Sequence, residues 1–561
     1  MVEDPTTPPP SARADLGERL IIALLGALLS VAVSGFLFGA DNNVFHLPIV
    51  DALYDEPAFA HDPFIQSLRF YASGLWLALR GVGRSMDPFW LFLGLHIAAR
   101  FLAFVGFLAC ADCLGLRTRE ARALFAAMIA LTPLLLRREG SYAGIGDLFS
   151  IALTHTSFTL GLTLLMLASL ARGHWARALG LNGVVFFFTP FVAVWNIVPL
   201  ALVGGTLARQ RWRTKAFWGQ TALGLSVALA CAVPVLVNVG ANPEVGAPLT
   251  FDYVAYLKEY FPFHFLFLSS PLSEMLALAT VFVLAGFALT ILKDPARPFL
   301  RLLGAYGAVY GLGIVLPWIT SNPLALNLHL LRVGAFLHVL AVLGGVAVAT
   351  RWLLTPKTPV ERSLGALLGL SMCAVNFSAL VLAPLVVILS VWRGESALSW
   401  AGGKRFERSQ GFILFMVLTC LPVVALFRGL SMWQEIQAED TVLAKWATVG
   451  TWARAHTPPE AVFLVELSSS GPWFSSSLIF EHTAHRSVWV DTKRGAAVMW
   501  SPSYYPIWRQ RLTEVQALRT HDERLAYARQ HNLAFVIDFC GESDSSKAVF
   551  QTKNLCVSDA R

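Results

Sequence analysis

The sequence predicts a mainly α-helical, polytopic membrane protein that carries a small α/β domain at its C-terminal end. Of its 561 residues, 56% are hydrophobic and 14% are charged, whereas soluble globular proteins have about 25% charged residues. Uncharged runs of about twenty residues recur along the chain, and this length crosses about 30 Å of hydrocarbon. Beyond residue 428, helix-type and strand-type segments alternate, which is the pattern of a small α/β domain.

The positive charges fit a membrane protein and exclude a nucleic-acid-binding one. The formal net charge is +7, but the Lys and Arg residues cluster in short loops between apolar runs, as membrane topology requires. The sequence contains no DNA- or RNA-binding motif, and no Walker, HExxH or dinucleotide-binding motif. We therefore expect membrane lipids as partners and no nucleic acid.

The N-terminal elements set the orientation. Residues 1–19 are Pro-rich and are predicted to form a disordered cytoplasmic tail. Residues 20–40 are too long for the apolar part of a signal peptide and lack its cleavage site, so they are predicted to be the first transmembrane helix. Arg13 and Arg19 precede this helix, which favours a cytoplasmic N terminus. The polar, aromatic segment 41–87 then becomes the first external loop.

Loop charge assigns the later spans. Two apolar runs, 178–208 and 364–392, are about thirty residues long and have cationic loops at both ends. Hairpins that turn near Pro190 and Asn376 keep those loops inside, whereas a single crossing would place one of them outside. The other spans are predicted at 88–114, 148–170, 216–239, 272–292, 299–319, 333–349 and 412–427, with a further one ending at Arg137 and Arg138.

The predicted total is about thirteen spans. The membrane domain therefore covers 20–428. Because the number of crossings is odd, residues 429–561 lie on the outer side. For a bacterial inner membrane protein this side is the periplasm, and we expect a multi-pass protein there.

The external domain is predicted to mix strands and helices. Strand-type runs occupy 461–466, 486–491 and 533–538, and helical patterns occupy 435–456, 505–519 and 522–531. Cys540 and Cys556 both lie in this domain. An oxidising compartment would allow them either to form a disulfide or to remain free thiols.

The first external loop concentrates acidic residues. It carries Asp41, Asp51, Asp55, Glu56 and Asp62 and has no Lys or Arg before Arg69. Asp41 lies at the membrane–water boundary, where partial desolvation raises the basicity of a carboxylate. It is therefore a candidate general base for a substrate in the bilayer. The alternative is a solvated loop in which Asp41 caps a short helix.

Three further residues of this loop have both a functional and a structural interpretation. Asp62 precedes Pro63, so it is either a functional acid or the cap of the following helix. His46 and His61 are candidates for assisting acceptor binding, although most such histidines are structural or simply exposed.

Arg332 is the second informative residue. It lies at the outer end of a predicted span, in NPLALNLHLLR, where the positive-inside bias makes Arg unusual. Its planar guanidinium suits phosphate; the alternative is a side chain that extends to the interface or pairs with an external acid. Arg137 and Arg138 break the same rule and are candidates for the same role.

These features together resemble the GT-C superfamily of polytopic glycosyltransferases. ADNNVFHLP and DEPAFAHDPF in the first loop, and TPPEAVFLVE and HRSVWVDTKRG in the external domain, look like uncharacterised bacterial members of this superfamily. The resemblance implies an enzyme that transfers a sugar from a polyprenyl-phosphate carrier to a glycan, lipid or protein acceptor at the outer face. The WWD signature of the oligosaccharyltransferase branch is missing, so the acceptor stays open.

The resemblance also implies residue roles. Asp41 would deprotonate the acceptor hydroxyl as the sugar transfers with inversion. Asp62 would orient the acceptor or a divalent cation such as Mg²⁺ or Mn²⁺. Arg332, together with Arg138, would bind the donor phosphate and stabilise the leaving group.

Two other function classes stay open. A transporter or flippase for lipid-linked saccharides would show internal repeats and broken midplane helices, and no convincing repeat is visible. A polysaccharide polymerase or ligase would act on similar substrates through external Arg and His residues. In the external domain, Asp491, Lys493 and Arg494 either bind an acceptor glycan or form a solvated turn. The aromatic residues near them, expected as stacking surfaces, are Trp489, Trp500, Tyr504, Tyr505 and Trp508.

Overall fold

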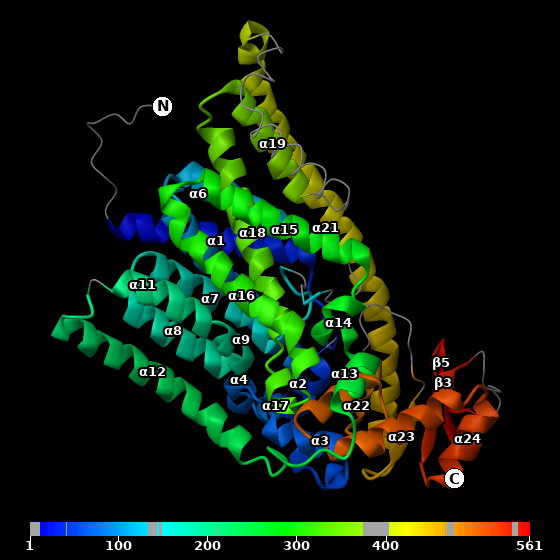
Figure 1. Cartoon of the computed structure of the whole chain (residues 1–561). Helices are drawn as coiled ribbons and strands as arrows, with labels where there is room; N and C mark the ends of the chain where they lie inside the picture. The colour runs from blue at the N-terminus through cyan, green and yellow to red at the C-terminus, as the bar shows by residue number, and fades with distance from the viewer. Residues whose placement is uncertain are drawn as a thin grey trace.

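The computed structural model describes residues 12–40, 42–132, 143–144, 148–209, 211–373, 403–465, 467, 476–540 and 548–561. Helices make up most of this part, and a small sheet lies near the C terminus (Figure 1). The predicted class, a polytopic helical membrane protein, is confirmed. Six helices in the described part are long and apolar enough to cross a membrane: Asp15–Ser34, Pro88–Cys113, Lys215–Gly240, Asp294–Ile319, Pro323–Leu354 and Gly411–His456.

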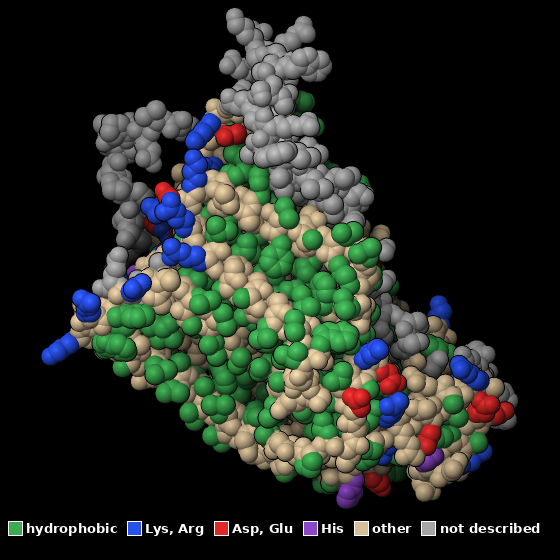
Figure 2. Space-filling model, viewed as in Figure 1, with side chains coloured by type: hydrophobic (Ala, Val, Ile, Leu, Met, Phe, Trp, Pro, Cys, Tyr) green, Lys and Arg blue, Asp and Glu red, His purple; other side chains and the backbone are tan. Residues whose placement is uncertain are grey.

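Shorter apolar helices fill the spaces between the long ones. They are His155–Ala171, Trp175–Phe188, Pro190–Gly204 and Leu278–Ile291. The predicted total of about thirteen spans includes segments within 133–142 and 374–402, which lie outside the described residues. Figure 2 shows a broad hydrophobic band across the molecule, with charged side chains gathered at its two ends.

The first helices of the bundle pack through small residues. α5 (Pro88–Cys113) lies between α1 (Ala12–Ser34) and α7 (His155–Ala171), and α6 (Arg119–Leu131) also packs against α1. A Cβ built on Gly106 of α5 would lie 2.8 Å from the carbonyl oxygen of Gly161 on α7. These two helices therefore approach at backbone distance, which is how many membrane helices associate.

The chain turns back near Pro190, where the sequence predicts a hairpin; the side of the membrane that its two ends face stays a prediction. α8 (Trp175–Phe188) is followed by α9 (Pro190–Trp195). The Asn182 side chain donates to the Ala193 carbonyl oxygen at 3.1 Å and accepts from Asn196 Nδ2 at 3.0 Å. The chain thus folds back on itself. The corresponding turn near Asn376 follows α19 (Pro359–Cys373) and lies outside the described residues.

The remaining long helices complete the bundle. α12 (Lys215–Gly240) packs along α8, and α15 (Leu272–Ile291) and α16 (Arg297–Ile319) pack against α18 (Gly334–Leu354). α18 is buried along almost its whole length. It is therefore the centre of this part of the bundle.

Short helices shape the loops at one end of the bundle. Proline begins three of them, and its fixed φ suits the first position of a helix. These loop helices are α2 (Asn43–Val50), α3 (Pro63–Ser67), α4 (Gly74–Ala78), α13 (Tyr253–Tyr260), α14 (Pro262–Phe265) and α17 (Pro323–Leu326).

One helix links the bundle to the C-terminal domain. α21 (Gly403–His456) has 54 residues, which corresponds to a length of about 80 Å, and it runs from one end of the molecule to the small sheet (Figure 1). The helix predicted at 435–456 is its last part. The predicted boundary at 428/429 lies within this continuous helix.

The C-terminal domain is a five-stranded mixed sheet with helices. The strand order is β2-β1-β3-β5-β4, in which β2, β1 and β3 are parallel and β5 is antiparallel to both of its neighbours. The strands are β1 (Val462–Val465), β2 (Ser487–Val488), β3 (Phe535–Phe539), β4 (Ala548–Gln551) and β5 (Leu555–Asp559). The helices are α22 (Ser476–Ala484), α23 (Tyr504–Ala517) and α24 (His521–Gln530). The three predicted strands and both predicted helices after residue 500 are confirmed.

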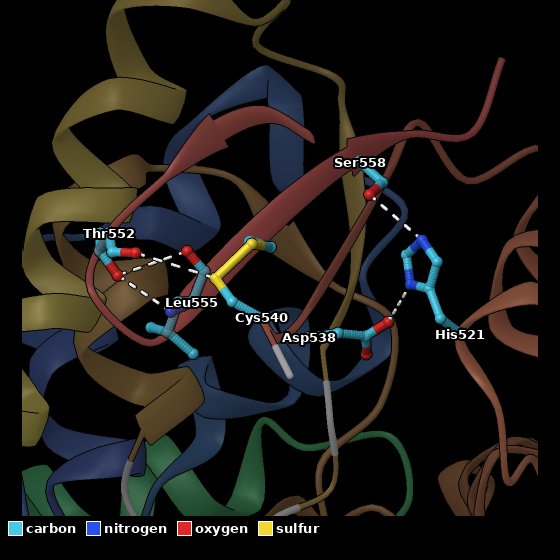
Figure 3. The surroundings of a disulfide bond; sticks show 7 residues. His521, Asp538, Cys540, Thr552, Leu555 and Ser558 are labelled. Carbon is cyan, nitrogen blue, oxygen red and sulfur yellow. Dashed lines mark hydrogen bonds and ion pairs between the residues drawn. A yellow bond between two sulfur atoms is a disulfide. The ribbon is translucent and has the colours of Figure 1, made fainter. Parts of the chain in front are cut away.

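Cys540 and Cys556 form a disulfide, with their Cα atoms 5.0 Å apart (Figure 3). Cys556 lies on β5, opposite Asp538 of β3, and Cys540 follows the end of β3. The bridge therefore fastens two paired strands at one end of the sheet.

The C-terminal domain and the loops at the adjoining end of the bundle share one hydrophobic core. Phe64 of the first loop, Tyr256 of the segment 240–271 and Trp508 of α23 are each essentially inaccessible to solvent and belong to the same cluster of buried residues. A separate core fills the helix bundle. The domain therefore packs directly against the loops through a shared core.

Candidate functional site

Three loop segments meet the C-terminal domain at one surface, which we call the junction. They are residues 42–87, 240–271 and 322–333. Each makes polar contacts with the domain: Asp51 with His482 at 2.5 Å, Glu56 with His485 at 3.0 Å, Tyr256 Oη with the Gly495 carbonyl at 2.7 Å, and Asn327 Nδ2 with the Met499 carbonyl at 2.8 Å.

Imidazoles and cationic side chains gather at the junction. We call this group the cationic cluster. It consists of His46, His155, His264, His329, Arg332 and Lys493, which interact electrostatically with one another. These residues come from five separate segments of the chain. The segments are α2, the start of α7, α14, the helical turn Leu330–Val333 with the residue before it, and the short helix Lys493–Met499.

His46 is fully buried at the centre of an aromatic group. Its ring stacks on Trp76 at 4.1 Å between centroids and meets His155 edge-on at 5.4 Å. Burial, followed by the neighbouring His155 imidazole and by the Lys493 cation, lowers the pKa of His46 well below its usual range. His46 is therefore neutral at neutral pH.

His264 is acted on by both cations of the cluster. Burial, followed by Arg332 and Lys493, lowers the pKa of His264 well below its usual range. Its Nδ1 is buried and has no hydrogen-bond partner among the described residues. Arg332 and Lys493 lie far apart in the sequence, yet both are close enough to act on this one imidazole. A guanidinium and an ammonium group that lie near the same imidazole suit an anion such as a phosphate ester.

Local structure explains how the two cations are presented. Lys493 opens a short helix whose first backbone N–H donates to the Asp491 carboxylate at 2.7 Å. Arg332 lies in a helical turn that follows His329, a residue in the left-handed region at φ 51°. Gly144, at φ +80°, approaches the Leu331 carbonyl so closely that a Cβ there would lie 1.9 Å from it. The predicted phosphate ligands Arg137 and Arg138 precede Gly144 in the chain and lie outside the described residues.

The catalytic candidate Asp41 also lies outside the described residues. The residues that flank it are anchored at the junction. Asn43 accepts from the Gly39 backbone at 3.1 Å and donates to the Leu153 carbonyl at 2.9 Å. Leu153 is two residues before His155 of the cationic cluster.

Asp62 has the contacts of a structural acid. Its Oδ1 accepts from the backbone N–H groups of Phe64 and Ile65 at 3.0 and 3.1 Å, which caps α3. Its Oδ2 accepts from Ser487 Oγ at 2.5 Å and lies 3.8 Å from Arg494. These internal contacts occupy both oxygens. They favour the cap over the expected role in orienting an acceptor or a cation.

Arg494 is likewise internal rather than acceptor-binding. It is 1% exposed and pairs at 2.7 Å with Glu481 of α22, which is fully buried. Burial raises the pKa of Glu481 to about 7, although Arg494 acts in the opposite direction. The expected solvated turn or glycan-binding group is therefore, at this position, a buried ion pair.

The other predicted residues also differ in whether they are buried in the core or lie near the cationic cluster or the surface. His61 is exposed, whereas His46 is buried. Trp500 borders the cluster, because it packs against Tyr71 at 5.4 Å, and Tyr71 packs against His155 at 5.5 Å. Trp508 is fully buried and donates to the Asp491 carbonyl at 2.9 Å. It belongs to the core and is not an open stacking surface.

A second polar group in the C-terminal domain has the connectivity of a hydrolase triad. His521 Nδ1 lies 2.6 Å from Asp538, and His521 Nε2 lies 3.3 Å from Ser558 Oγ (Figure 3). Asp538 is fully buried and also forms an ion pair with Arg524 at 2.8 Å, and Ser558 is 2% exposed. Because all three side chains are buried, the group joins α24, β3 and β5 as a structural network.

The described residues contain no group of three or more His, Cys, Asp or Glu side chains that is placed to hold a metal ion. Arg332 and Lys493, the two cations of the cluster, would themselves partly neutralise the negative charge of a phosphate. A divalent cation therefore stays a prediction.

One part of the chain matches a family model. Residues 444–515 match a family described as a domain of unknown function, DUF6798, and this stretch runs from the last part of α21 into α23. No curated protein matches the chain. A crystal structure of ArnT from Cupriavidus metallidurans in the apo state is similar to the chain with 11% sequence identity and a TM-score of 0.37, over 98% of each chain. A similarity at this level does not define a shared fold or activity.

Proposed function

We propose that this membrane protein is a glycosyltransferase that moves a sugar from a polyprenyl-phosphate-linked donor to an acceptor at the outer face of a bacterial inner membrane. The observation that carries the proposal is the joint action of Arg332 and Lys493 on His264. These two cations lie between the helix bundle and the C-terminal domain. A phosphate on a lipid carrier, whose polyprenyl chain stays in the bilayer, fits this position.

The proposed chemistry is an inverting displacement. Arg332 and Lys493 bind the donor phosphate, with Arg138 as a further candidate. Asp41 takes the proton of the acceptor hydroxyl, and the hydroxyl oxygen forms a bond to the anomeric carbon of the sugar. The bond between that carbon and the phosphate oxygen breaks, and its electron pair leaves with the polyprenyl phosphate. The cations stabilise the charge that develops on this leaving group.

The remaining roles follow from the contacts. His46, which is neutral at neutral pH, is suited to hydrogen bonding rather than to charge pairing. Trp500 and Tyr71 offer aromatic surface beside the cluster for the sugar ring. A divalent cation, Mg²⁺ or Mn²⁺, would assist if Asp41 binds it. The acceptor is a glycan, lipid or protein.

The histidines favour a second candidate, a polymerase or ligase of lipid-linked saccharides. His46, His155, His264 and His329 bring four imidazoles into one site. In such an enzyme an imidazole, and not Asp41, would take the proton of the acceptor. A flippase would use the same phosphate site without forming a product.

The test uses the full-length protein in lipid nanodiscs with a panel of polyprenyl-phosphate-linked sugars. We expect Asp41→Asn to abolish transfer, because it removes the base without changing the shape of the side chain. It should leave the binding of polyprenyl phosphate, measured by native mass spectrometry, unchanged. Full transfer by this variant would overturn the catalytic role of Asp41, and loss of transfer in His264→Gln alone would favour the polymerase or ligase.

The donor site has its own test. We expect Arg332→Gln and Lys493→Gln each to weaken the binding of polyprenyl phosphate about tenfold or more, since a charge-assisted hydrogen bond contributes about 1.5–3 kcal/mol. Lys258→Gln is the matched control, because Lys258 is an exposed cation on the segment 240–271. Unchanged binding in both cluster variants would contradict the donor site.

A further inference from the structure

A second cationic site lies at the end of the bundle opposite the C-terminal domain. A cavity of about 580 Å³ opens there, and its lining includes Arg19, Asp112, Arg117, Arg172 and Asp294. The first four of these residues lie near the start of α1 and around the ends of α5 and α7. Figure 2 shows Lys and Arg side chains gathered at this end of the molecule.

The acids beside the cavity are already engaged. Asp112 is 7% exposed and pairs with Arg122 at 3.0 Å and with Arg19 at 2.5 Å, while Arg172 lies 3.9 Å away. Asp15 pairs with Arg19 and with Arg122. Glu18 lies 3.8 Å from Arg122, so three carboxylates face the guanidinium groups of Arg19, Arg122 and Arg172. Arg117, which also lines the cavity, adds a fourth guanidinium group and leaves an excess of positive charge.

The cations retain capacity for a ligand. The side chains of Arg19 and Arg172 are 35% and 37% exposed. The Nε of Arg19 is buried and has no hydrogen-bond partner within the described part of the chain. Asp294 pairs with Arg297 at 2.8 Å, so it does not neutralise these two cations. Since the planar donor groups of Arg match the oxygens of a phosphate, the cavity is suited to a phosphate-bearing group.

An apolar cavity adjoins the polar one. It has a volume of about 300 Å³, and its wall includes Leu20, Leu108 and Leu165. Arg19 and Arg172 line both cavities. A free phosphate ion would leave the apolar cavity unused, whereas a phospholipid would fill both.

We propose that this paired cavity binds an anionic glycerophospholipid, with its headgroup phosphate on Arg19 and Arg172 and an acyl chain against Leu108 and Leu165. Basic pockets between transmembrane helices on the cytoplasmic side recognise anionic lipid headgroups. The basic loops at this end of the bundle give it that side by the positive-inside rule. The site is separate from the donor site, and it would hold α1, α5 and α7 together.

The experiment measures thermal unfolding of the full-length protein in a neutral detergent with added lipid. We expect phosphatidylglycerol to raise the melting temperature by several degrees, since a ligand that binds only the folded state stabilises it. Phosphatidylcholine and inorganic phosphate at the same concentrations should not. An equal shift with phosphatidylcholine, or with inorganic phosphate, would overturn the proposal in favour of general lipid solvation or of a free-anion site.

Two variants separate lipid binding from folding. Arg172→Gln removes a headgroup ligand whose ion pair with Asp112 is long, at 3.9 Å, and Leu165→Trp fills the apolar cavity and keeps every charge. We expect each to weaken the binding of phosphatidylglycerol, measured by native mass spectrometry, about tenfold or more. Arg213→Gln is the control, because Arg213 is exposed at the same end and lines neither cavity. Unchanged binding in both variants would overturn the proposal.

Discussion

At the scale of single residues, buried imidazoles decide how the junction responds to acid. His46 and His264 both have a pKa well below the usual range, because they are buried beside cations. In an unfolded chain the same side chains would titrate near pH 6.5. Below that pH the unfolded state binds protons that the folded state does not bind, so the free energy of unfolding falls as the pH falls.

This difference predicts an acid-sensitive melting temperature. We expect the melting temperature of the full-length protein to fall between pH 7.5 and pH 5.5, and His46→Gln to make this fall smaller. At one pH unit below the unfolded pKa, a single depressed histidine accounts for at most about 1.4 kcal/mol. The exposed His61 provides the control variant, His61→Gln. Equal pH dependence in the wild type and in His46→Gln would contradict the role of His46.

For single residues, the sequence predicted the kind of chemistry that a side chain suits better than it predicted which residues that side chain contacts. Arg332 was a phosphate candidate, and it does act on a shared imidazole with Lys493. His264 was not a candidate, because nothing in the segment 240–271 points to the other segments that meet it. The same limit applies to Asp62. Its position before Pro63 allowed a cap, but only the folded chain brings Ser487 and Arg494 beside it.

At the scale of elements, the packing of α5 on α7 depends on glycine. A Cβ on Gly106 would lie 2.7 Å from the Leu164 Cβ and 2.8 Å from the Gly161 oxygen, whereas a Cβ on Gly94 of the same helix meets nothing within 4 Å. We expect Gly106→Ala to destabilise the protein by about 1–3 kcal/mol through overpacking. Gly94→Ala should be neutral or slightly stabilising, because Ala favours a helix over Gly by about 1 kcal/mol.

The measurement is thermal unfolding of both variants in detergent, followed by tryptophan fluorescence. Each substitution adds one methyl group to α5. A difference in melting temperature between the two variants therefore reports the helix contact and not the substitution itself. Equal melting temperatures would show that α5 and α7 do not approach at Gly106.

The disulfide is the second element with a measurable consequence. Cys540 and Cys556 are separated by 16 residues in sequence, and a bridge that closes a loop of this size contributes about 3 kcal/mol. We expect the Cys540→Ser and Cys556→Ser double variant to lower the stability of the C-terminal domain by that order and to speed its proteolysis. The free Cys231 gives the control, Cys231→Ser. Alkylation of all seven cysteines without a reductant would contradict the bridge.

The helices and strands that the sequence predicts correctly are those with a clear hydrophobic periodicity or a clearly bounded apolar run. β1 and β3 are apolar runs, and both helices near the end of the chain begin where the pattern places them. β4 was missed because its residues alternate between exposed and half-buried, which makes an edge strand resemble a loop. α22 was missed because it is short and rich in Ser and Thr, and its buried Glu481 meets Arg494 only in the folded domain.

At the scale of the whole molecule, two charged ends and one shared core define its sidedness. The loops of the junction and the C-terminal domain are buried against one another. The cavity lined by Arg19, Arg117 and Arg172 is built from the opposite ends of α1, α5 and α7. The positive-inside rule favours the cytoplasm for that basic end, and we therefore expect the junction to face the periplasm.

This sidedness predicts the behaviour of reporter fusions. Alkaline phosphatase is active only in the periplasm and green fluorescent protein fluoresces in the cytoplasm, so each reports one side. We expect phosphatase activity from a fusion at residue 561, and fluorescence from fusions at the N terminus and after Arg213. Phosphatase activity from a fusion after Gly246 is the control for the segment 240–271. If the reporters placed both termini on the same side of the membrane, the number of crossings would be even. The run 364–392 would then cross once, and Arg332 and Lys493 would lose their common access to a donor at the outer face.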